Sequence, residues 1–279
     1  MPNKILEKEY LAENVVSMWI EARQIAKKRQ PGQFLILRPG ERSERIPLTI
    51  ADVRAKEGAV RLIVQVVGKT TRDLAALEAG EYVRDVAGPL GHPTPIKHYG
   101  TVACVGGGIG VAPLLPIARA MKEAGNYVVS IIGARTKGLL ILEEDMRAIS
   151  DELLITTDDG SYVRHGLVTD VLRERLTGKP GIDFAVAIGP VPMMKAVANL
   201  TREAGIATIA SLNTIMIDGT GMCGGCRVTV GGRVKYTCVD GPEFDAHEVD
   251  FDELQRRLNM YRDHELHQLE ACKIGLAVR

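Results

Sequence analysis

The chain has 279 residues, enough for about two domains that each bury their own core. It carries 35 basic and 35 acidic residues, so the formal net charge is zero and nothing favours a nucleic-acid partner. No run approaches the ~18 apolar residues of a membrane span, and the charged N-terminus lacks a signal-peptide core. We therefore expect a cytoplasmic protein with no nucleic-acid or membrane partner, in which clustered cysteines serve metal or redox chemistry.

Residues 1–98 have the pattern of a small antiparallel β-barrel or sandwich. Apolar β-type runs at 15–22, 31–40 and 60–68 are short and are separated by Gly and Pro. Short strands that follow one another with turns between them favour a barrel or a sandwich.

Residues 99–212 alternate between strands and helices. Apolar runs at 101–110, 127–134, 152–159 and 184–189 predict strands, and the stretches at 111–125, 142–150, 167–176 and 193–205 predict helices. This alternation is typical of an α/β domain with a doubly wound parallel sheet that is covered on both faces.

Residues 213–279 form a third, smaller unit. Glycine and cysteine become frequent after residue 212, and the segment 226–238 predicts a hairpin that turns at Gly231 and Gly232. Apolar residues at helical spacing between Asp250 and Gln268 predict one amphipathic C-terminal helix.

A glycine turn joins the first predicted strand of the α/β domain to its helix. The run VGGGIGVAP contains Gly106, Gly107, Gly108 and Gly110. Small residues let a phosphate approach the backbone, and the helix N-terminus supplies donors, as in a dinucleotide pyrophosphate site. The spacing departs from GxGxxG at Val111, and the next strand ends at Arg135 instead of an acidic residue. A glycine turn without ligand stays open, and Arg135 could serve a 2′-phosphate or simply be an exposed loop residue.

Three of the five cysteines, Cys223, Cys226 and Cys238, fall within sixteen residues. Asp218 stands five positions before Cys223, so the spacing is that of a plant-type [2Fe–2S] loop, CxxxxCxxC with a distant fourth Cys, except that aspartate takes the first place. Glycines at 219, 221, 224 and 225 would let the backbone wrap closely around a cluster. The pattern predicts Asp218, Cys223, Cys226 and Cys238 as metal ligands.

Other interpretations of these cysteines stay open. Zinc could take the three thiols with His247 or Asp218 as its fourth ligand. A redox disulfide would leave Cys238 without a role, and a plain turn would expose free thiols without compensation. Cys104 lies in an apolar strand and is expected to be a core residue, and Cys272 has no cysteine neighbour.

Together, the β-rich first unit, the GGGIGVAP turn and the segment SLNTIMIDGTGMCGGC resemble the ferredoxin reductase-type flavoprotein family over nearly the full chain. Within it, the sequence is similar to electron-transfer subunits of class B dihydroorotate dehydrogenase. It is more similar to small subunits of NADH-dependent ferredoxin:NADP oxidoreductases, also known as sulfide dehydrogenase beta subunits. Asp218 stands where the former have their first cysteine, and the resemblance to the latter implies an aspartate ligand.

The resemblance implies that the barrel binds FAD through R45-I-P-L-T49, I63-V-Q65 and G68-K-T-T71. Leu48 and Thr49 would line the isoalloxazine ring, and the third segment would present amides and hydroxyls to phosphate. The family's motif is RxYS, and RIPLT has one residue more between arginine and hydroxyl. The implied flavin-site residues are Arg45, Pro47, Leu48, Thr49, Ile63, Val64, Gln65, Gly68, Thr70 and Thr71.

For NAD(H) or NADP(H), the resemblance implies that the glycine turn faces the pyrophosphate. T157-D-D-G-S161 and G189-P-V-P-M-M194 would border the nicotinamide pocket. Ile188 replaces the cysteine that such reductases often carry before the Gly-Pro pair, which removes a contact and not the site. The residues implied here are Asp158, Asp159, Gly189, Pro190 and Met193.

The implied function is electron transfer between NAD(P)(H), FAD and a [2Fe–2S] cluster, with no acid–base catalytic residue. A flavin must stand between the nicotinamide, which gives two electrons as hydride, and the cluster, which takes one. The expected partner is a larger flavin and [4Fe–4S] subunit of an electron-bifurcating NADH-dependent ferredoxin:NADP oxidoreductase, with ferredoxin as an indirect partner.

The final helix, with His264 and His267 in it and His247 just before it, is a candidate docking surface or a helix packed on its own domain. Two other functions stay open: the electron-transfer subunit of class B dihydroorotate dehydrogenase, and a zinc-bearing nucleotide-binding module.

Overall fold

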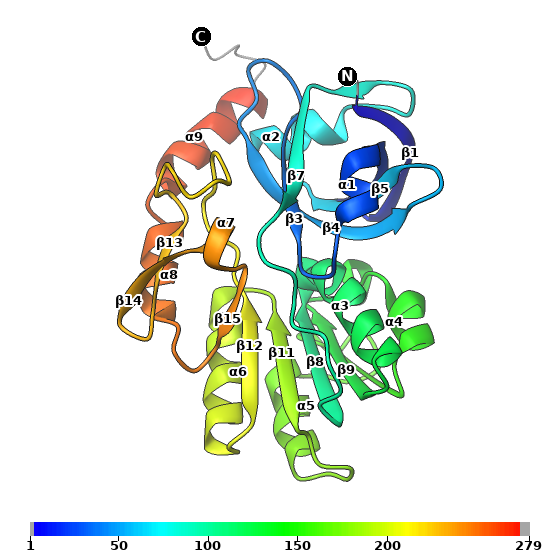
Figure 1. Ribbon diagram of the computed structural model, residues 1–279, viewed down its shortest axis with the longest axis vertical. Helices are drawn as coiled ribbons and strands as arrows, with labels where there is room; N and C mark the ends of the chain where they lie inside the picture. Colours follow the sequence, from blue (N-terminus) through cyan, green and yellow to red (C-terminus); the bar gives the residue numbers. More distant parts are fainter. Residues whose placement is uncertain (1–2, 274–279) are drawn as a thin grey trace.

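Two large sheets and one small hairpin make up the computed structural model (Figure 1). The structure describes the backbone of residues 3–273 and the side chains as far as residue 267. The side chain of Cys272 therefore lies outside the described residues. So do residues 1–2 of the first predicted unit and residues 274–279 of the third. Among residues 3–273, no helix combines the length and the apolar character that a membrane crossing needs.

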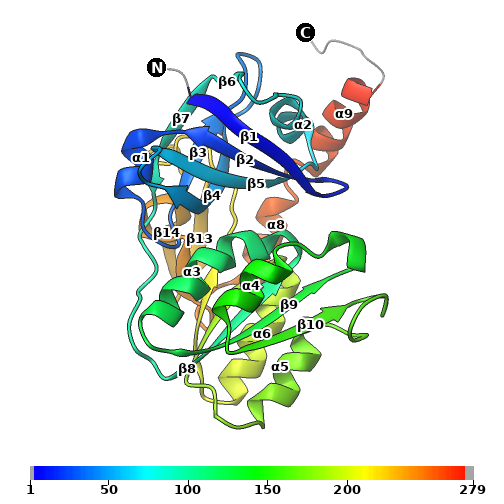
Figure 2. The same ribbon diagram turned by 90° about the vertical axis from the view of Figure 1, so that its right-hand side faces the viewer.

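The first sheet has seven antiparallel strands in the order β6-β1-β2-β5-β4-β3-β7, and it curves into a barrel (Figure 2). The elements are β1 (Asn3–Ala12), β2 (Val15–Glu21), α1 (Arg23–Lys28), β3 (Phe34–Arg38), β4 (Ile46–Arg54), β5 (Ala59–Gln65), α2 (Lys69–Ala75), β6 (Tyr82–Val83) and β7 (Asp85–Leu90). Alternate side chains such as Met18, Leu35 and Leu62 fill its interior. The predicted antiparallel barrel is confirmed.

The second sheet has the order β10-β9-β8-β11-β12-β15, and its first five strands are parallel. The elements are β8 (Thr101–Gly107), η1 (Gly108–Gly110), α3 (Val111–Glu123), β9 (Tyr127–Ala134), η2 (Lys137–Leu139), α4 (Glu143–Ile149), β10 (Glu152–Thr157), α5 (Val168–Leu176), β11 (Phe184–Ile188), α6 (Val191–Glu203) and β12 (Ala207–Ser211). Helices α3 and α4 pack on one face, α5 and α6 on the other. The strand order reverses between β8 and β11, so the predicted doubly wound sheet is confirmed, with its switch point there.

The remaining elements are β13 (Arg227–Val230), β14 (Arg233–Tyr236), α7 (Thr237–Asp240), β15 (Glu243–Asp245), α8 (Phe251–Leu258) and α9 (Arg262–Lys273). Gly231 and Gly232 have φ values of +56° and +72°, so the predicted hairpin turn is confirmed. The sequence did not predict β15, which pairs antiparallel with β12 and extends the second sheet.

The prediction of one C-terminal helix is wrong, because the chain breaks between α8 and α9. Phe251 and Leu254 of α8 are buried in the core that α6 also lines, whereas residues 261–267 are exposed. The apolar residues thus anchor only the first two turns, and the backbone turns at Asn259, whose carbonyl accepts from the amide of Arg262.

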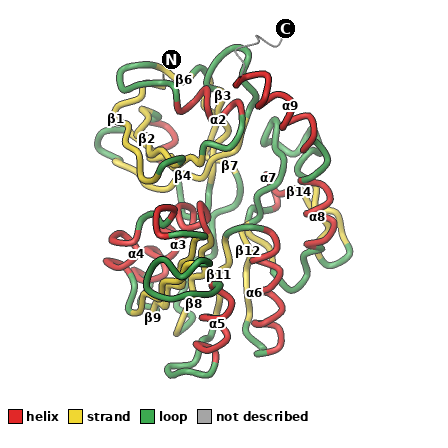
Figure 3. The backbone as a smooth tube through the Cα atoms, turned by 180° about the vertical axis from the view of Figure 1, so that it is seen from behind, coloured by secondary structure: helices red, strands yellow, loops and turns green. Residues whose placement is uncertain are grey.

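The barrel packs on the α/β unit through β4, β5 and α3. Val15, Ala51 and Ile63 of the barrel share a buried core with α3 and the second sheet. Arg119 of α3 donates to the carboxylate of Asp52 on β4 at 3.0 Å. In Figure 3 the barrel accordingly lies next to α3.

Candidate functional site

Residues 217–226, here named the cysteine loop, form the second part of the connection between β12 and the hairpin. The backbone has positive φ at Gly219 (+77°), Gly221 (+83°) and Gly224 (+67°), a region that glycine enters without steric cost. These three positions let the loop wind tightly and place Cys226 beside Cys238 of α7.

The thiols of Cys226 and Cys238 face each other with their Sγ atoms 3.2 Å apart. Both side chains are buried, and both cysteines are free. Burial, and then the hydrogen bond with Cys226, raises the pKa of Cys238 to about 12. A buried thiolate needs a compensating cation, and a metal centre is one that would deprotonate such a pair. The donor chemistry of the two thiols therefore fits half of an iron–sulfur site.

A hydrogen bond within the cysteine loop links the other two predicted ligands, Asp218 and Cys223. The Asp218 carboxylate accepts from the amides of Thr220 at 2.9 Å and Cys223 at 3.0 Å. These hydrogen bonds, the one from Thr220 first, lower the pKa of Asp218. The Cys223 side chain is exposed. Among the described residues no three His, Cys, Asp or Glu side chains converge tightly enough to hold a metal ion, so two ligands would have to turn inward.

His247 does not complete a zinc site with the cysteines. Its Nε2 lies 3.0 Å from the hydroxyl of Thr201 on α6, so the three-cysteine and histidine set is not assembled. Cys104 is fully buried in β8, where burial raises its pKa to about 12, as expected for a core residue.

The cysteine loop packs on the outer face of the barrel. Phe34 and Ile36 of β3 share a buried core with Cys226 and Cys238. A Cβ atom on Gly219 would lie 2.7 Å from the side chain of Ile36, so the loop approaches β3 too closely for any residue but glycine. The run FLILR is apolar on both faces of β3: Leu35 and Leu37 face the barrel interior, and Phe34 and Ile36 face the opposite side. This pattern indicates a second buried face, but the sequence did not identify the cysteine loop as the segment that covers it.

The segment 47–49 of β4 lies directly beside this contact. Thr49 is opposite Phe34 and Pro47 is opposite Ile36, so their side chains share the face that the cysteine loop covers. Leu48 packs toward the barrel interior. The Arg45 side chain is directed to the cysteine loop, where its Nε donates to the carbonyl oxygen of Ile217 at 2.7 Å.

The other predicted flavin segments face different environments. Ile63 packs toward α3, Val64 toward the barrel interior, and Gln65 is half-buried. The space beside the Gly68 Cα is open. The hydroxyls of Thr70 and Thr71 are used within the chain: Thr70 is buried and accepts from the amide of Glu44, and Thr71 accepts from the amide of Gly68.

The glycine turn meets the Gly189–Met193 segment at the switch point. A Cβ atom on Gly107 would lie 2.5 Å from Sδ of Met193, and one on Gly110 would lie 2.3 Å from the carbonyl oxygen of Ile188. Gly108 has a φ of +56° and open space beside it. The glycines at the carboxyl ends of β8 and β11 thus let these two segments approach closely at the switch point, which is where open α/β sheets of this kind bind dinucleotides.

Arg135, Asp158 and Asp159 gather two strands away. The three side chains are exposed, and the amides of Asp158 and Asp159 donate to the carbonyls of Ala134 and Arg135. The TDDGS segment therefore lies beside Arg135 at the end of β9, while Gly189, Pro190 and Met193 lie at the end of β11.

The fold and the similar proteins together define an oxidoreductase of the ferredoxin reductase type with an iron–sulfur binding domain. A family model described as the iron-sulfur cluster binding domain of dihydroorotate dehydrogenase B matches residues 213–250. The Amycolatopsis cytochrome P450 reductase shares the fold, with a TM-score of 0.60 at 22% identity over 73% of this chain and 65% of that one.

Relatives of high identity give the family. The dihydroorotate dehydrogenase B electron transfer subunit homolog of Thermotoga maritima is 50% identical over 94% of this chain and 93% of its own length. The dihydroorotate dehydrogenase B electron transfer subunit of Geobacillus thermodenitrificans is 36% identical, over 88% and 96%. The chain belongs to the family of dihydroorotate dehydrogenase B electron transfer subunits and their homologues.

A solved structure of the NADH-dependent reduced ferredoxin-NADP oxidoreductase, studied for flavin-based electron bifurcation, is similar over the whole chain. It is 48% identical, with a TM-score of 0.91 and 97% of both chains covered. The resemblance stated from the sequence is confirmed, and family and fold support the predicted cofactors: FAD, a [2Fe–2S] cluster and a nicotinamide nucleotide.

Proposed function

We propose that this chain is the electron-transfer subunit of an electron-bifurcating NADH-dependent ferredoxin:NADP oxidoreductase, exchanging electrons with a larger flavin and [4Fe–4S] subunit. The observation that carries the proposal is the 48% identity and the TM-score of 0.91 to that enzyme's structure. Asp218 supports it as well, because the resemblance to this group implies an aspartate in the first ligand position, and the sequence has one there.

The chain's own residues would orient the cofactors. When bound, FAD and the cluster supply the conversion between two-electron hydride chemistry and one-electron transfer. The outer face of β4 at Pro47 and Thr49 would hold the flavin, and the switch point at Gly107 and Gly108 would hold the nucleotide. The packing of the cysteine loop on β3 supports this assignment, because β3 is the direct neighbour of β4.

The cluster ligands in this proposal are Asp218, Cys223, Cys226 and Cys238. Cys226 and Cys238 already face each other, while Asp218 would exchange its two backbone amides for iron and Cys223 would turn inward. Glycines on both sides of these residues give the loop the backbone freedom that this requires.

Anaerobic reconstitution with iron, sulfide and FAD tests the proposal. We expect about two irons per chain, bound FAD, and oxidation of NADH or NADPH with an artificial electron acceptor. Cys238→Ser should lose the iron and keep the FAD. A chain that binds one zinc and no iron, or that binds both cofactors and oxidises neither nucleotide, would overturn the proposal.

A second candidate is the electron-transfer subunit of a dihydroorotate dehydrogenase, favoured by the names of the relatives from Thermotoga and Geobacillus. Addition of a dihydroorotate dehydrogenase catalytic subunit and orotate to the reconstituted chain separates the two. Orotate reduction by NADH would support this candidate, and copurification with a [4Fe–4S] subunit and ferredoxin-dependent turnover would support the first.

A further inference from the structure

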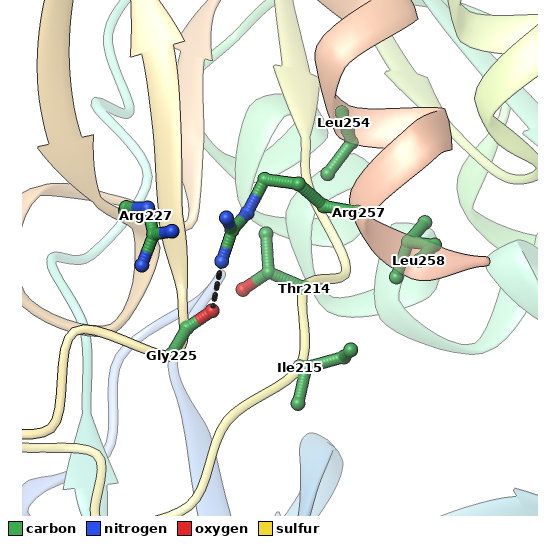
Figure 4. A pocket seen from close by; sticks show the side chains of 7 residues that line it. All are labelled: Thr214, Ile215, Gly225, Arg227, Leu254, Arg257 and Leu258. Carbon is green, nitrogen blue, oxygen red and sulfur yellow. Dashed lines mark hydrogen bonds between the residues drawn. The ribbon is translucent and has the colours of Figure 1, made fainter. Parts of the chain in front are cut away.

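Two arginines from distant parts of the chain donate to the backbone of the cysteine loop. Arg45, which immediately precedes β4, donates to the carbonyl oxygen of Ile217 at 2.7 Å. Arg257 of α8 donates from Nη2 to the carbonyl oxygen of Gly225 at 3.1 Å, the dashed line in Figure 4. The loop is thus held at both ends, from the barrel and from α8.

Each of these carbonyls belongs to the peptide unit that precedes a predicted ligand. The Ile217 carbonyl shares a peptide unit with the amide of Asp218, and the Gly225 carbonyl shares one with the amide of Cys226. In a trans peptide the C=O and N–H groups point in opposite directions. A guanidinium that fixes the carbonyl therefore also fixes the direction of the ligand's own amide, away from the arginine.

Neither guanidinium group takes part in a salt bridge among the described residues. Arg257 and Arg45 are half-buried, so solvent screens them less than a fully exposed side chain. Reduction adds negative charge to an iron–sulfur cluster, and a nearby positive charge stabilises the reduced form.

The cavity beside Arg257 is too small for a ligand. The cavity beside it is about 10 Å³ and is lined by Thr214, Leu254 and Leu258 among others (Figure 4). A cavity of this size holds no more than about one water molecule. The guanidinium points at Gly225 and not at an anion-sized space, so its structural partner is the loop itself.

We propose that Arg45 and Arg257 are positioning residues of the iron–sulfur site. They hold the peptide units that precede Asp218 and Cys226, and their charges raise the reduction potential of the cluster. The second effect rests on the proposed function, because it requires a bound cluster; the first does not.

The positioning effect is measured in the metal-free chain by hydrogen exchange of loop peptides covering residues 213–226. Loss of a hydrogen bond to a charged donor should speed exchange about tenfold or more in Arg45→Met and Arg257→Met. Arg42→Met and Arg256→Met, which remove exposed arginines next to each site, serve as controls and should leave exchange unchanged. Loop exchange at the wild-type rate in both test variants overturns the positioning role.

The electrostatic effect is measured by redox titration of the reconstituted chain, followed by electron paramagnetic resonance. Arg257→Met should lower the reduction potential, whereas Arg257→Lys should keep the potential near the wild-type value while loop exchange still accelerates. A potential that is unchanged in Arg257→Met refutes the electrostatic role. A wild-type chain that binds no [2Fe–2S] cluster refutes the proposed function instead, and leaves the exchange result as an independent test of positioning.

Discussion

The carboxyl group of Glu243 should make the stability of this protein fall as pH rises toward neutrality. Glu243 lies on β15, and its Oε1 is buried with no hydrogen-bond partner among the described residues. The Glu243 carboxyl group lies where two other parts of the chain meet, Gly32 of the barrel and Thr94 in the linker between the two large sheets. A Cβ atom added to Gly32 would lie 2.1 Å from the hydroxyl of Thr94 and 2.9 Å from Oε2 of Glu243. Burial at this junction raises the pKa of Glu243 to about 7.

The sign and the size of the effect follow from the two pKa values. The folded chain keeps the proton up to about pH 7, whereas the unfolded chain releases it near 4.5. The stabilisation is therefore complete below pH 4.5, falls as pH rises from there to 7, and is lost above 7. At about 1.36 kcal/mol for each pH unit between these values, the loss amounts to about 3 kcal/mol.

Glu243→Gln keeps the shape of the side chain and removes the proton equilibrium. We expect it to stabilise the chain by up to about 3 kcal/mol at pH 8, which raises the midpoint of thermal unfolding by on the order of 5–10 °C. Most of this gain should disappear by pH 5. Glu203→Gln, at an exposed glutamate near the end of α6, is the matched control. A Glu243→Gln chain whose unfolding midpoint follows the wild-type pH dependence would show that the reasoning is wrong.

Three further predictions concern the sites and the contact between the sheets. Asp218→Cys should keep a cluster but change its absorption spectrum and potential, because thiolate is softer than carboxylate; identical spectra and potentials would remove Asp218 from the ligand set. Gly107→Ala should raise the KM for the nucleotide several-fold, since its Cβ would lie 2.5 Å from Met193 Sδ, and Met193→Ala in the same chain should restore part of the loss. Arg119→Met should cost about 1 kcal/mol or less in thermal unfolding, because it removes a half-exposed ion pair with Asp52.

The sequence predicted those elements whose apolar residues are continuous. The run that becomes β8 is buried at every position, and a fully apolar stretch before a glycine turn has few other structures open to it. β1 and β4 escaped prediction because their residues are mostly half-buried or exposed, and Pro47 interrupts β4. β15 is only three residues long, and only its pairing with β12 makes it a strand.

At the candidate site, spacing predicted the facing thiols of Cys226 and Cys238 but not what surrounds them. Hydrogen bonds from Arg45 and Arg257 cross 172 and 32 positions of the chain. No local period encodes such contacts, because they depend on how the barrel and α8 pack around the loop. Arg45, which the resemblance implied as a flavin-site residue, has a backbone carbonyl of the cysteine loop as its observed partner.

The position of Arg45 links the two proposed cofactor sites in a way that Arg257 does not. Arg45 immediately precedes the β4 segment proposed to face the flavin, and the carbonyl that it binds immediately precedes Asp218. Phe34 and Thr49 stand opposite each other on neighbouring strands, which are separated by about 4.8 Å. Because β3 contacts the cysteine loop on this same face, a shift of the loop would also displace the surface beside Thr49. Arg45→Met should therefore weaken FAD retention together with loop order, whereas Arg257→Met, which loosens the loop from the far side, should weaken FAD retention less.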